Sequence, residues 1–268
     1  MISHDEQTIV SRLRAAGCVF AEEEAAILIE SAGSDEALAS MVERRIAGVP
    51  LEHVVGWVSF CGLRIEVDLG VFVPRQRSEL LVRQAVRVTR KRSATADAPL
   101  TIVDLACGCG ALGLAAASLL PESGSRVFAV DVEEAAVACA RRNLERVGGQ
   151  AFLGDLYAAL PAQLRGRVDL IVANVPYVPT AEVALMPREA RAHEPLIALD
   201  GGRDGLDVLR RVVASAGAWL APGGHVVLET SQAQAPAALQ AMITAGLTPS
   251  SAYDDDLYAT AVIGRSSP

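Results

Sequence analysis

Apolar residues recur every three or four positions along the first 47 residues, as on one face of a helix. Three glycines interrupt this spacing, and short helices are expected to end near them: Gly17, Gly33 and Gly48. Between residues 57 and 67, apolar and polar positions alternate on either side of Gly62, and this pattern predicts a β-hairpin with a tight turn. Ser78 is a suitable N-cap for a further helix that runs to about residue 90.

After Pro99, short runs of β-branched residues alternate with stretches of helical spacing. Strands are expected at 100–105, 126–130, 151–153, 168–173 and 225–229. Helices are expected at 112–120, 133–147, 206–220 and 235–245. Two final strands are expected around an acidic turn, at 251–253 and 258–263. This alternation predicts a parallel sheet with helices on both faces, joined to the preceding helix by a linker over 90–99.

Composition narrows the class of protein. Of the 268 residues, 51% are hydrophobic and 21% are charged, which suffices for a folded core. The net charge of −8 disfavours a general attraction to nucleic acid or to an anionic membrane. No apolar run is long enough to span a bilayer, and the first residues lack the basic and apolar segments of a secretory signal. We therefore expect a cytoplasmic enzyme or binding protein.

The cysteines and histidines show no metal-binding pattern. The five cysteines include one C-x-C pair, Cys107 and Cys109, and the four histidines are scattered. Neither spacing is that of a structural zinc site or a disulfide framework. We expect reduced thiols and no bound metal.

A glycine-rich turn follows the first strand of the alternating region. Gly108, Gly110 and Gly113 fit G-x-G-x-x-G between a predicted strand and a predicted helix. Glycines there let a ligand approach the backbone, and the start of the helix offers free N–H groups. The pattern suits a dinucleotide or S-adenosylmethionine, and a tight turn without a ligand is the alternative.

Acidic residues follow the next two strands. Asp131 ends the second strand, where a carboxylate can accept hydrogen bonds from both ribose hydroxyls of an adenosine group, or simply cap a helix. Asp155 and Leu156 follow the third strand, where they would meet the amino group and the ring of an adenine. For these two residues a surface turn is the alternative.

The segment Asn174-Val175-Pro176-Tyr177 leaves the fourth strand, and Pro176 and Pro179 hold its backbone extended. The Asn174 amide oxygen and the Val175 carbonyl are then two acceptors for an NH₂ group that must face a methyl donor. Tyr177 adds a ring face for a flat amide or base. A dehydrogenase has no need of these groups, whereas a proline-rich loop that only caps the strand remains an alternative.

The order of these motifs resembles that of class I, S-adenosylmethionine-dependent methyltransferases. The Asn174–Tyr177 segment resembles the N-P-P-Y signature of enzymes that methylate planar nitrogens, either adenine N6 or glutamine N5. Other segments resemble the HemK/PrmC family of protein-(glutamine-N5) methyltransferases, which modify peptide chain release factors. These segments are Glu52–Gly56, Val71–Arg75, His193–Pro195 with Ala198 and Leu199, Gly202 with Gly205, and Val227–Glu229.

The resemblance implies an α/β, Rossmann-like fold with a mostly parallel seven-stranded sheet whose last strand is antiparallel. It implies a helical substrate-recognition domain over 1–50, a β-hairpin linker over 51–75 and a methyltransferase domain over 76–268. The residues implied to bind S-adenosylmethionine are Asp104, Ala106, Cys107, Gly108, Cys109, Gly110, Asp131, Asp155, Leu156 and Asn174. Those implied to hold the substrate amide and to act in catalysis are Asn174, Val175, Pro176 and Tyr177.

The chain departs from the family pattern at Ala106, where the family has glycine, and at Val175, where it has proline. Residues 76–79 and 257–259 differ as well. The expected partner is a protein, and the expected substrate is the Gly-Gly-Gln loop of a class I release factor. No nucleic acid or membrane partner is expected. No catalytic histidine is expected either. The alternatives are a glutamine in another, ribosomal protein, adenine N6 in DNA or RNA, a nicotinamide-dependent dehydrogenase, and a binding module without activity.

Overall fold

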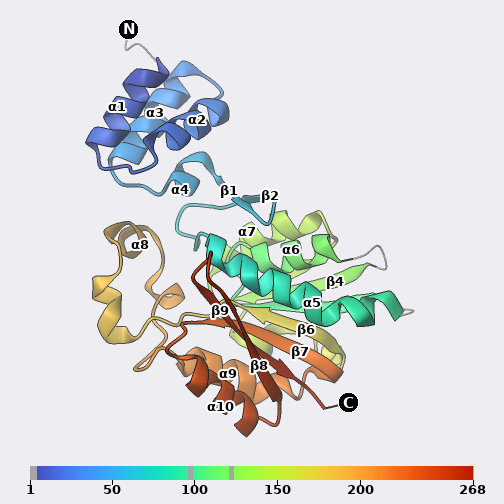
Figure 1. The fold of residues 1–268 in the computed structure, drawn as a ribbon. Coiled ribbons are helices and arrows are strands. Elements are labelled where there is room, and N and C mark those ends of the chain that lie inside the picture. Colours follow the sequence, from blue (N-terminus) through green and yellow to red (C-terminus); the bar gives the residue numbers. More distant parts are fainter. Residues whose placement is uncertain (1–4, 96–98, 121–123, 268) are drawn as a thin grey trace.

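The computed structural model describes residues 5–95, 99–120 and 124–267. Four helices form its N-terminal part: α1 (Glu6–Ala15), α2 (Ala21–Ser31), α3 (Asp35–Ile46) and the short α4 (Leu51–Val55). The first three lie together, apart from the sheet (Figure 1), and bury Leu13, Ala25 and Leu28 in a core of their own. The helical spacing of the sequence is matched by these elements, whereas the domain boundaries at residues 50 and 75 stay a prediction.

A β-hairpin and a long helix connect this part to the sheet. These elements are β1 (Trp57–Phe60), β2 (Leu63–Glu66), the single turn η1 (Gln76–Ser78) and α5 (Glu79–Thr95). The two strands pair antiparallel, as predicted, and Phe60 and Ile65 are buried in the core of the sheet region. The predicted linker over 90–99 is wrong at 90–95, because no glycine or proline there stops the helix. Residues 96–98 of that linker lie outside the described part of the chain.

Seven strands form the main sheet: β3 (Leu100–Leu105), β4 (Ser125–Asp131), β5 (Gln150–Leu153), β6 (Val168–Ala173), β7 (Leu220–Thr230), β8 (Thr248–Asp254) and β9 (Ala259–Arg265). Their order across the sheet is β5-β4-β3-β6-β7-β9-β8. The last strand, β9, runs antiparallel to β7 and β8, and the pairs from β5 to β7 are parallel. The predicted fold is therefore confirmed.

Helices cover both faces of this sheet (Figure 1). The remaining elements are α6 (Ala111–Leu119), α7 (Glu134–Glu145), η2 (Leu156–Ala159), η3 (Ala162–Leu164), η4 (Thr180–Leu185), α8 (Arg188–His193), η5 (Leu196–Ala198), α9 (Asp207–Ala216) and α10 (Ala235–Thr244). Neighbouring strand residues point to opposite faces: Ile102 packs with α5, α6 and α7, and Val103 packs with α9 and α10. Each face thus buries a separate apolar cluster.

One predicted helix is too long. The spacing predicted a helix over 206–220, but α9 ends at Ala216 and is followed by Gly217. Leu220 instead begins β7, where it pairs with Val168 of β6, so tertiary pairing decides the end of the helix. Among the described residues, no helix is both long and apolar enough to cross a membrane.

Candidate functional site

Three loops meet at one edge of the sheet because their strands are adjacent and parallel. Leu105, the last residue of β3, pairs with Val130 of β4 on one side and with Ala173 of β6 on the other. Asp131 therefore follows on one side of the glycine-rich loop and Asn174 on the other. The chain proceeds from β3 outward to β5 and then returns to β6, so this edge is the topological switch point where open α/β sheets bind ligands.

The glycine-rich loop adopts a left-handed backbone at three positions. Ala106 has φ 52°, Gly108 φ 53° and Gly110 φ 79°. Gly110 is also the N-cap residue of α6, so the free N–H groups of that helix begin at the loop. A side chain at Gly113 would place its Cβ 3.0 Å from Val127, so this glycine permits the close packing of helix on sheet.

Asp104 lies beneath the loop and not in the cavity beside it. It is fully buried, and its Oδ2 accepts a hydrogen bond from the backbone N–H of Gly113 over 2.8 Å. Its other oxygen, Oδ1, is buried with no hydrogen-bond partner. Burial raises the pKa of Asp104 to about 8, against the lowering effect of the Gly113 N–H. The residue braces the loop, so a direct contact with a cofactor stays a prediction.

Asp131 ties the loop to the neighbouring strand. Its Oδ2 accepts from the N–H of Gly108 over 2.8 Å, and its Oδ1 accepts from the N–H of Glu133 over 3.0 Å. A carboxylate offers about four lone-pair sites, so both oxygens retain capacity for hydroxyl donors. The side chain therefore caps the following turn and also faces the cavity.

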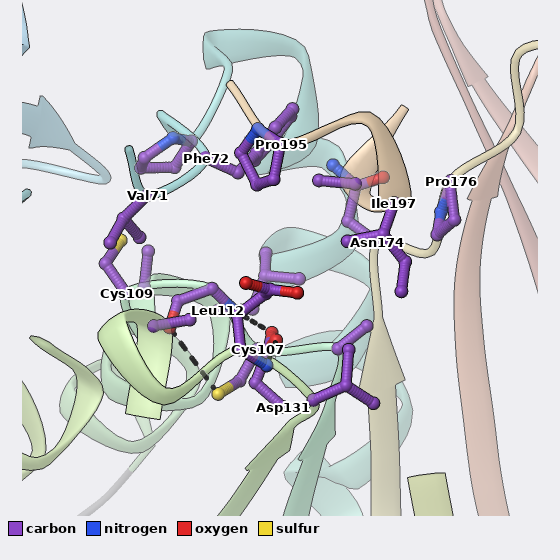
Figure 2. A pocket seen from close by; sticks show the side chains of 18 of the residues that line it. Val71, Phe72, Cys107, Cys109, Leu112, Asp131, Asn174, Pro176, Pro195 and Ile197 are labelled. Carbon is purple, nitrogen blue, oxygen red and sulfur yellow. Dashed lines mark hydrogen bonds between the residues drawn. The ribbon is translucent and has the colours of Figure 1, made fainter. Parts of the chain in front are cut away.

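A cavity with about 780 Å³ of space between its atoms lies over these loops. Its floor includes Ala106, Cys107, Gly108 and Cys109. Figure 2 shows Phe72 and Pro195 across the cavity from Cys107 and Asp131. At another end, Asn174, Pro176 and Ile197 lie together (Figure 2).

A smaller cavity of about 420 Å³ adjoins the first and shares residues with it, including Ala106, Asp131 and Pro176. Asp155 and Leu156 line it, and Leu156 has a left-handed φ of 46°. The structure thus brings these two residues into one cavity with Asp131, and their contact with an adenine stays a prediction.

Arg211, which the sequence did not single out, also lines the smaller cavity. Its guanidinium pairs with the carboxylate of Asp155 at 2.5 Å. The two side chains come from different elements, 56 positions apart.

The residues of the Asn174–Tyr177 segment do not all face the cavities. Asn174 faces the large cavity, and its Nδ2 donates to Oγ of Ser78 over 3.0 Å. Val175 is 1% exposed and packs in the core between the sheet and the helices α9 and α10. This apolar core accommodates valine where the family has proline. Pro176 lines both cavities.

Tyr177 is turned toward a buried acid. Its hydroxyl donates to Oε1 of Glu229 over 2.8 Å, and Nε of Arg77 donates to the same oxygen over 3.0 Å. The Arg77 guanidinium also lies 5.7 Å from the centre of the Tyr177 ring. Burial and the Glu229 carboxylate raise the pKa of Tyr177. Tyr177 is absent from the lining of the large cavity, so its predicted ring contact with a substrate stays a prediction.

A second buried acid, Glu194, connects two segments that line the large cavity. Both carboxylate oxygens of Glu194 accept from Arg75, over 2.6 and 2.7 Å, and Oε1 also accepts from the N–H of Val73. Burial raises the pKa of Glu194 despite the cation beside it. This pair joins the loop before η1 to the segment before η5, and both segments line the cavity.

The local sequence gives no signal for these partnerships. Ser78 lies 96 positions from Asn174, Arg75 lies 119 from Glu194, and Arg77 lies 152 from Glu229. Because the sheet brings them together, no spacing rule finds them.

The five cysteines are free. Cys107 and Cys109 line the cavity, and burial raises the pKa of both thiols, which keeps them protonated. The Cys107 thiol contacts the carbonyl of Gly108 at 3.6 Å (Figure 2). In the described part of the chain, no cluster of three His, Cys, Asp or Glu side chains has the arrangement of a metal site.

Known proteins with a similar sequence are methyltransferases. The protein-family model for the methyltransferase small domain matches residues 83–190. The release factor glutamine methyltransferase of Gloeobacter violaceus is 41% identical over 210 residues, covering 76% of this chain and 70% of that protein. The enzyme of the same name from Bradyrhizobium diazoefficiens is 36% identical over 255 residues, covering 87% and 84%.

Solved structures resemble the fold at lower identity. A methyltransferase from Pyrococcus furiosus gives a TM-score of 0.56 at 17% identity, covering 77% of this chain and 90% of that one. The 16S rRNA methyltransferase RsmC of T. thermophilus, in complex with AdoMet and guanosine, gives 0.54 at 20% identity, covering 78% and 49%. Both are similar in fold.

Proposed function

The chain belongs to the release factor glutamine methyltransferase family, and from that premise we propose that it methylates a glutamine side chain in the Gly-Gly-Gln loop of a release factor. It is a methyltransferase that uses S-adenosylmethionine, and its substrate is a protein. The observation that supports this substrate chemistry is the pairing of Leu105 with Ala173. Because Asn174 and Val175 directly follow Ala173, we propose that the Asn174 amide oxygen and the Val175 carbonyl hold the substrate carboxamide beside the glycine-rich loop.

The residues around the two cavities fit the cofactor. The left-handed Gly108 lines the large cavity and leaves the loop backbone open to a ligand there, and Asp131 retains acceptor sites for ribose hydroxyls. The adjoining cavity has the apolar wall and the carboxylate that suit an adenine, from Leu156 and Asp155. When bound, S-adenosylmethionine supplies a methyl group on a sulfonium, which is already an activated electrophile.

The side chain of Asn174 and the carbonyl of Val175 would act on the substrate nitrogen. An amide nitrogen is a weak nucleophile because its lone pair is shared with its carbonyl. Two fixed acceptors can hold both N–H groups, orient the lone pair and stabilise the positive charge that develops on the nitrogen. Once methylated, the nitrogen can lose a proton to solvent, so no strong base is required.

An open groove beside the site offers a place for the rest of a protein substrate. It holds about 1200 Å³ and is lined by α2, the Arg75–Arg77 segment and the residues before α8. Both signs of charge line it, with Glu23 and Glu52 near Arg75 and Arg77. We propose that the helical N-terminal part and this groove dock the release factor, and that the reaction takes place in the cytoplasm where that substrate works.

The relatives do not favour methylation of adenine in nucleic acid, and the net charge of −8 agrees with them. A glutamine in another, ribosomal protein is the remaining alternative, and the experiment below addresses it.

The test is mass spectrometry of an unmodified class I release factor from the same organism, incubated with this protein and S-adenosylmethionine. One methyl group on the glutamine of the Gly-Gly-Gln loop is the expected result. Its absence, with cofactor binding intact in the same sample, would refute the release factor as substrate.

Asn174→Ala tests the site itself. Turnover should fall by roughly 10²-fold, as when a preorganised polar contact is removed, while cofactor affinity is largely kept. Thr180→Ala serves as a matched control, because the Thr180 side chain is exposed, does not line the cavity and donates its hydroxyl to Asp200. An unchanged rate in Asn174→Ala would remove Asn174 from the reaction.

A further inference from the structure

Ser78 lines the large cavity and bonds to Asn174. It ends the turn η1, is 1% exposed, and accepts a hydrogen bond from Nδ2 of Asn174 over 3.0 Å. Its own backbone N–H donates to the carbonyl of Arg75 over 2.9 Å, which fixes the turn. The hydrogen bond between Asn174 and Ser78 therefore connects the turn before α5 to the residue that follows β6.

A carboxamide has a donor end and an acceptor end, and rotation about its last side-chain bond exchanges them. To hold a substrate NH₂ group, Asn174 must present its oxygen, because a second NH₂ would face donor with donor. The bond to Ser78 uses the Asn174 nitrogen and leaves Oδ1 for the cavity. The bond holds the carboxamide in place, and its removal frees the Asn174 side chain to rotate.

The platform that holds Ser78 is rigid on both sides. Arg75 is paired with the buried Glu194, and Arg77 is paired with the buried Glu229. The next residue, Glu79, accepts the backbone N–H of Cys61 over 2.8 Å. A supporting group held in this way can keep a reacting side chain in one geometry.

We propose that Ser78 is a positioning residue that holds the Asn174 carboxamide in place for the substrate amide. The inference rests on the proposed function, because it assigns Ser78 an effect only through Asn174. It extends the substrate site to a residue of the first half of the chain, 96 positions away.

The first test is a double-mutant cycle with Ser78→Ala, Asn174→Ala and the pair, measured on the release factor substrate. Ser78→Ala should lower kcat by about 3- to 10-fold, the effect of one neutral hydrogen bond, with cofactor Kd unchanged within about twofold. In the Asn174→Ala background it should have no further effect. Ser78→Thr keeps the hydroxyl and should restore most of the rate.

The control is Thr89→Val. Thr89 is a buried hydroxyl of α5, the helix that follows Ser78; it is 1% exposed, and its Oγ1 donates to the carbonyl of Ala85. It lies away from the cavity lining, so its loss should leave kcat unchanged. A fall in kcat equal to that of Ser78→Ala would mean that loss of any buried hydroxyl in this region lowers the rate, and would overturn the proposal.

A second test needs no turnover. The chain has two asparagines, Asn143 and Asn174, so ¹⁵N-asparagine labelling gives two side-chain NH₂ signals. Asn143 donates to the carbonyls of Glu66 and Cys109 and serves as the internal reference. In Ser78→Ala, exchange of the Asn174 NH₂ protons with solvent should speed up about 3- to 10-fold, while that of Asn143 stays constant.

The outcomes separate the two proposals. Additive rate losses in the cycle, an equally slow Ser78→Thr, or unchanged exchange at Asn174 would overturn the role of Ser78 and leave the proposed function standing. An undiminished rate in Asn174→Ala would overturn both.

Discussion

Replacing Arg75 with alanine would leave the Glu194 carboxylate buried without its cation. The Glu194 side chain is 1% exposed and Arg75 contacts both of its oxygens, over 2.6 and 2.7 Å. Removing one partner of a buried ion pair costs about 3–5 kcal/mol of unfolding free energy. The lower end applies here, because the Arg75 side chain is 33% exposed and the N–H of Val73 remains as a donor.

The cost should depend on pH. Burial already raises the pKa of Glu194, and loss of Arg75 would raise it further. A carboxyl whose pKa is raised on folding stabilises the folded state fully below its unfolded pKa and loses that stability as pH rises through the folded value. Arg75→Ala should therefore cost about 3 kcal/mol at pH 8 and clearly less at pH 5.

The assay is urea and thermal unfolding of the full chain at both pH values. At pH 8 the melting temperature should fall by about 6–12 °C, since 1 kcal/mol shifts a domain of this size by about 2–4 °C. Adding Glu194→Gln should restore much of the loss, because the buried charge is then gone. The contact of Arg75 with the Phe72 ring, at 5.0 Å, is lost at every pH and so cannot produce the pH dependence.

Two results would refute this reasoning. An equal cost at pH 5 and pH 8 would show that Glu194 is not held as a charged group. A double variant no more stable than Arg75→Ala would show that packing of the arginine, and not its charge, stabilises the wall of the cavity.

Three further predictions concern the loops. Because the pKa of Asp104 is raised to about 8, the wild type should lose stability as pH rises from about 4 to about 8, and Asp104→Asn should flatten urea midpoints between pH 6 and 9; parallel slopes would contradict this. Ala106 has φ 52°, so Ala106→Gly should change stability by less than about 1 kcal/mol and keep cofactor affinity. Ala106→Val should lower both the stability, measured by thermal unfolding, and the cofactor affinity, measured by titration. A Cβ at Gly201 would lie 2.6 Å from the Pro176 carbonyl oxygen, so Gly201→Ala should lower kcat more than cofactor affinity, and an unchanged kcat would count against it.

Much of the fold followed from local patterns. The alternation at 57–67 gave the hairpin, and the β-branched runs after Pro99 gave strands that the structure confirms, because period and burial are coupled within a few residues. The boundaries were less certain where no local signal marks them. Residue 220 belongs to a strand and not a helix because its pairing partner, Val168, lies far away in the sequence.

The sequence likewise predicted part of the candidate site and left the rest to the tertiary structure. The motifs located the glycine-rich loop, Asp131 and the Asn174 segment, because each follows a strand whose carboxyl end is recognisable in the sequence. Their neighbourhood depended on the order of the strands, since only the placement of β3 between β4 and β6 sets the three loops side by side. The sequence could not supply that order, which results from contacts summed over the whole sheet.

The sequence by itself determined the order of the strands and helices along the chain and the motifs from which a cofactor site and an amide site are predicted. The tertiary structure alone decided that Asp104 supports the loop from below, that Tyr177 turns to Glu229, and that Ser78 meets Asn174. Propensity and periodicity act over one or two helical turns, whereas a buried hydrogen bond depends on which distant group folding delivers to it. The position of the Asn174 side chain is therefore a property of the folded chain.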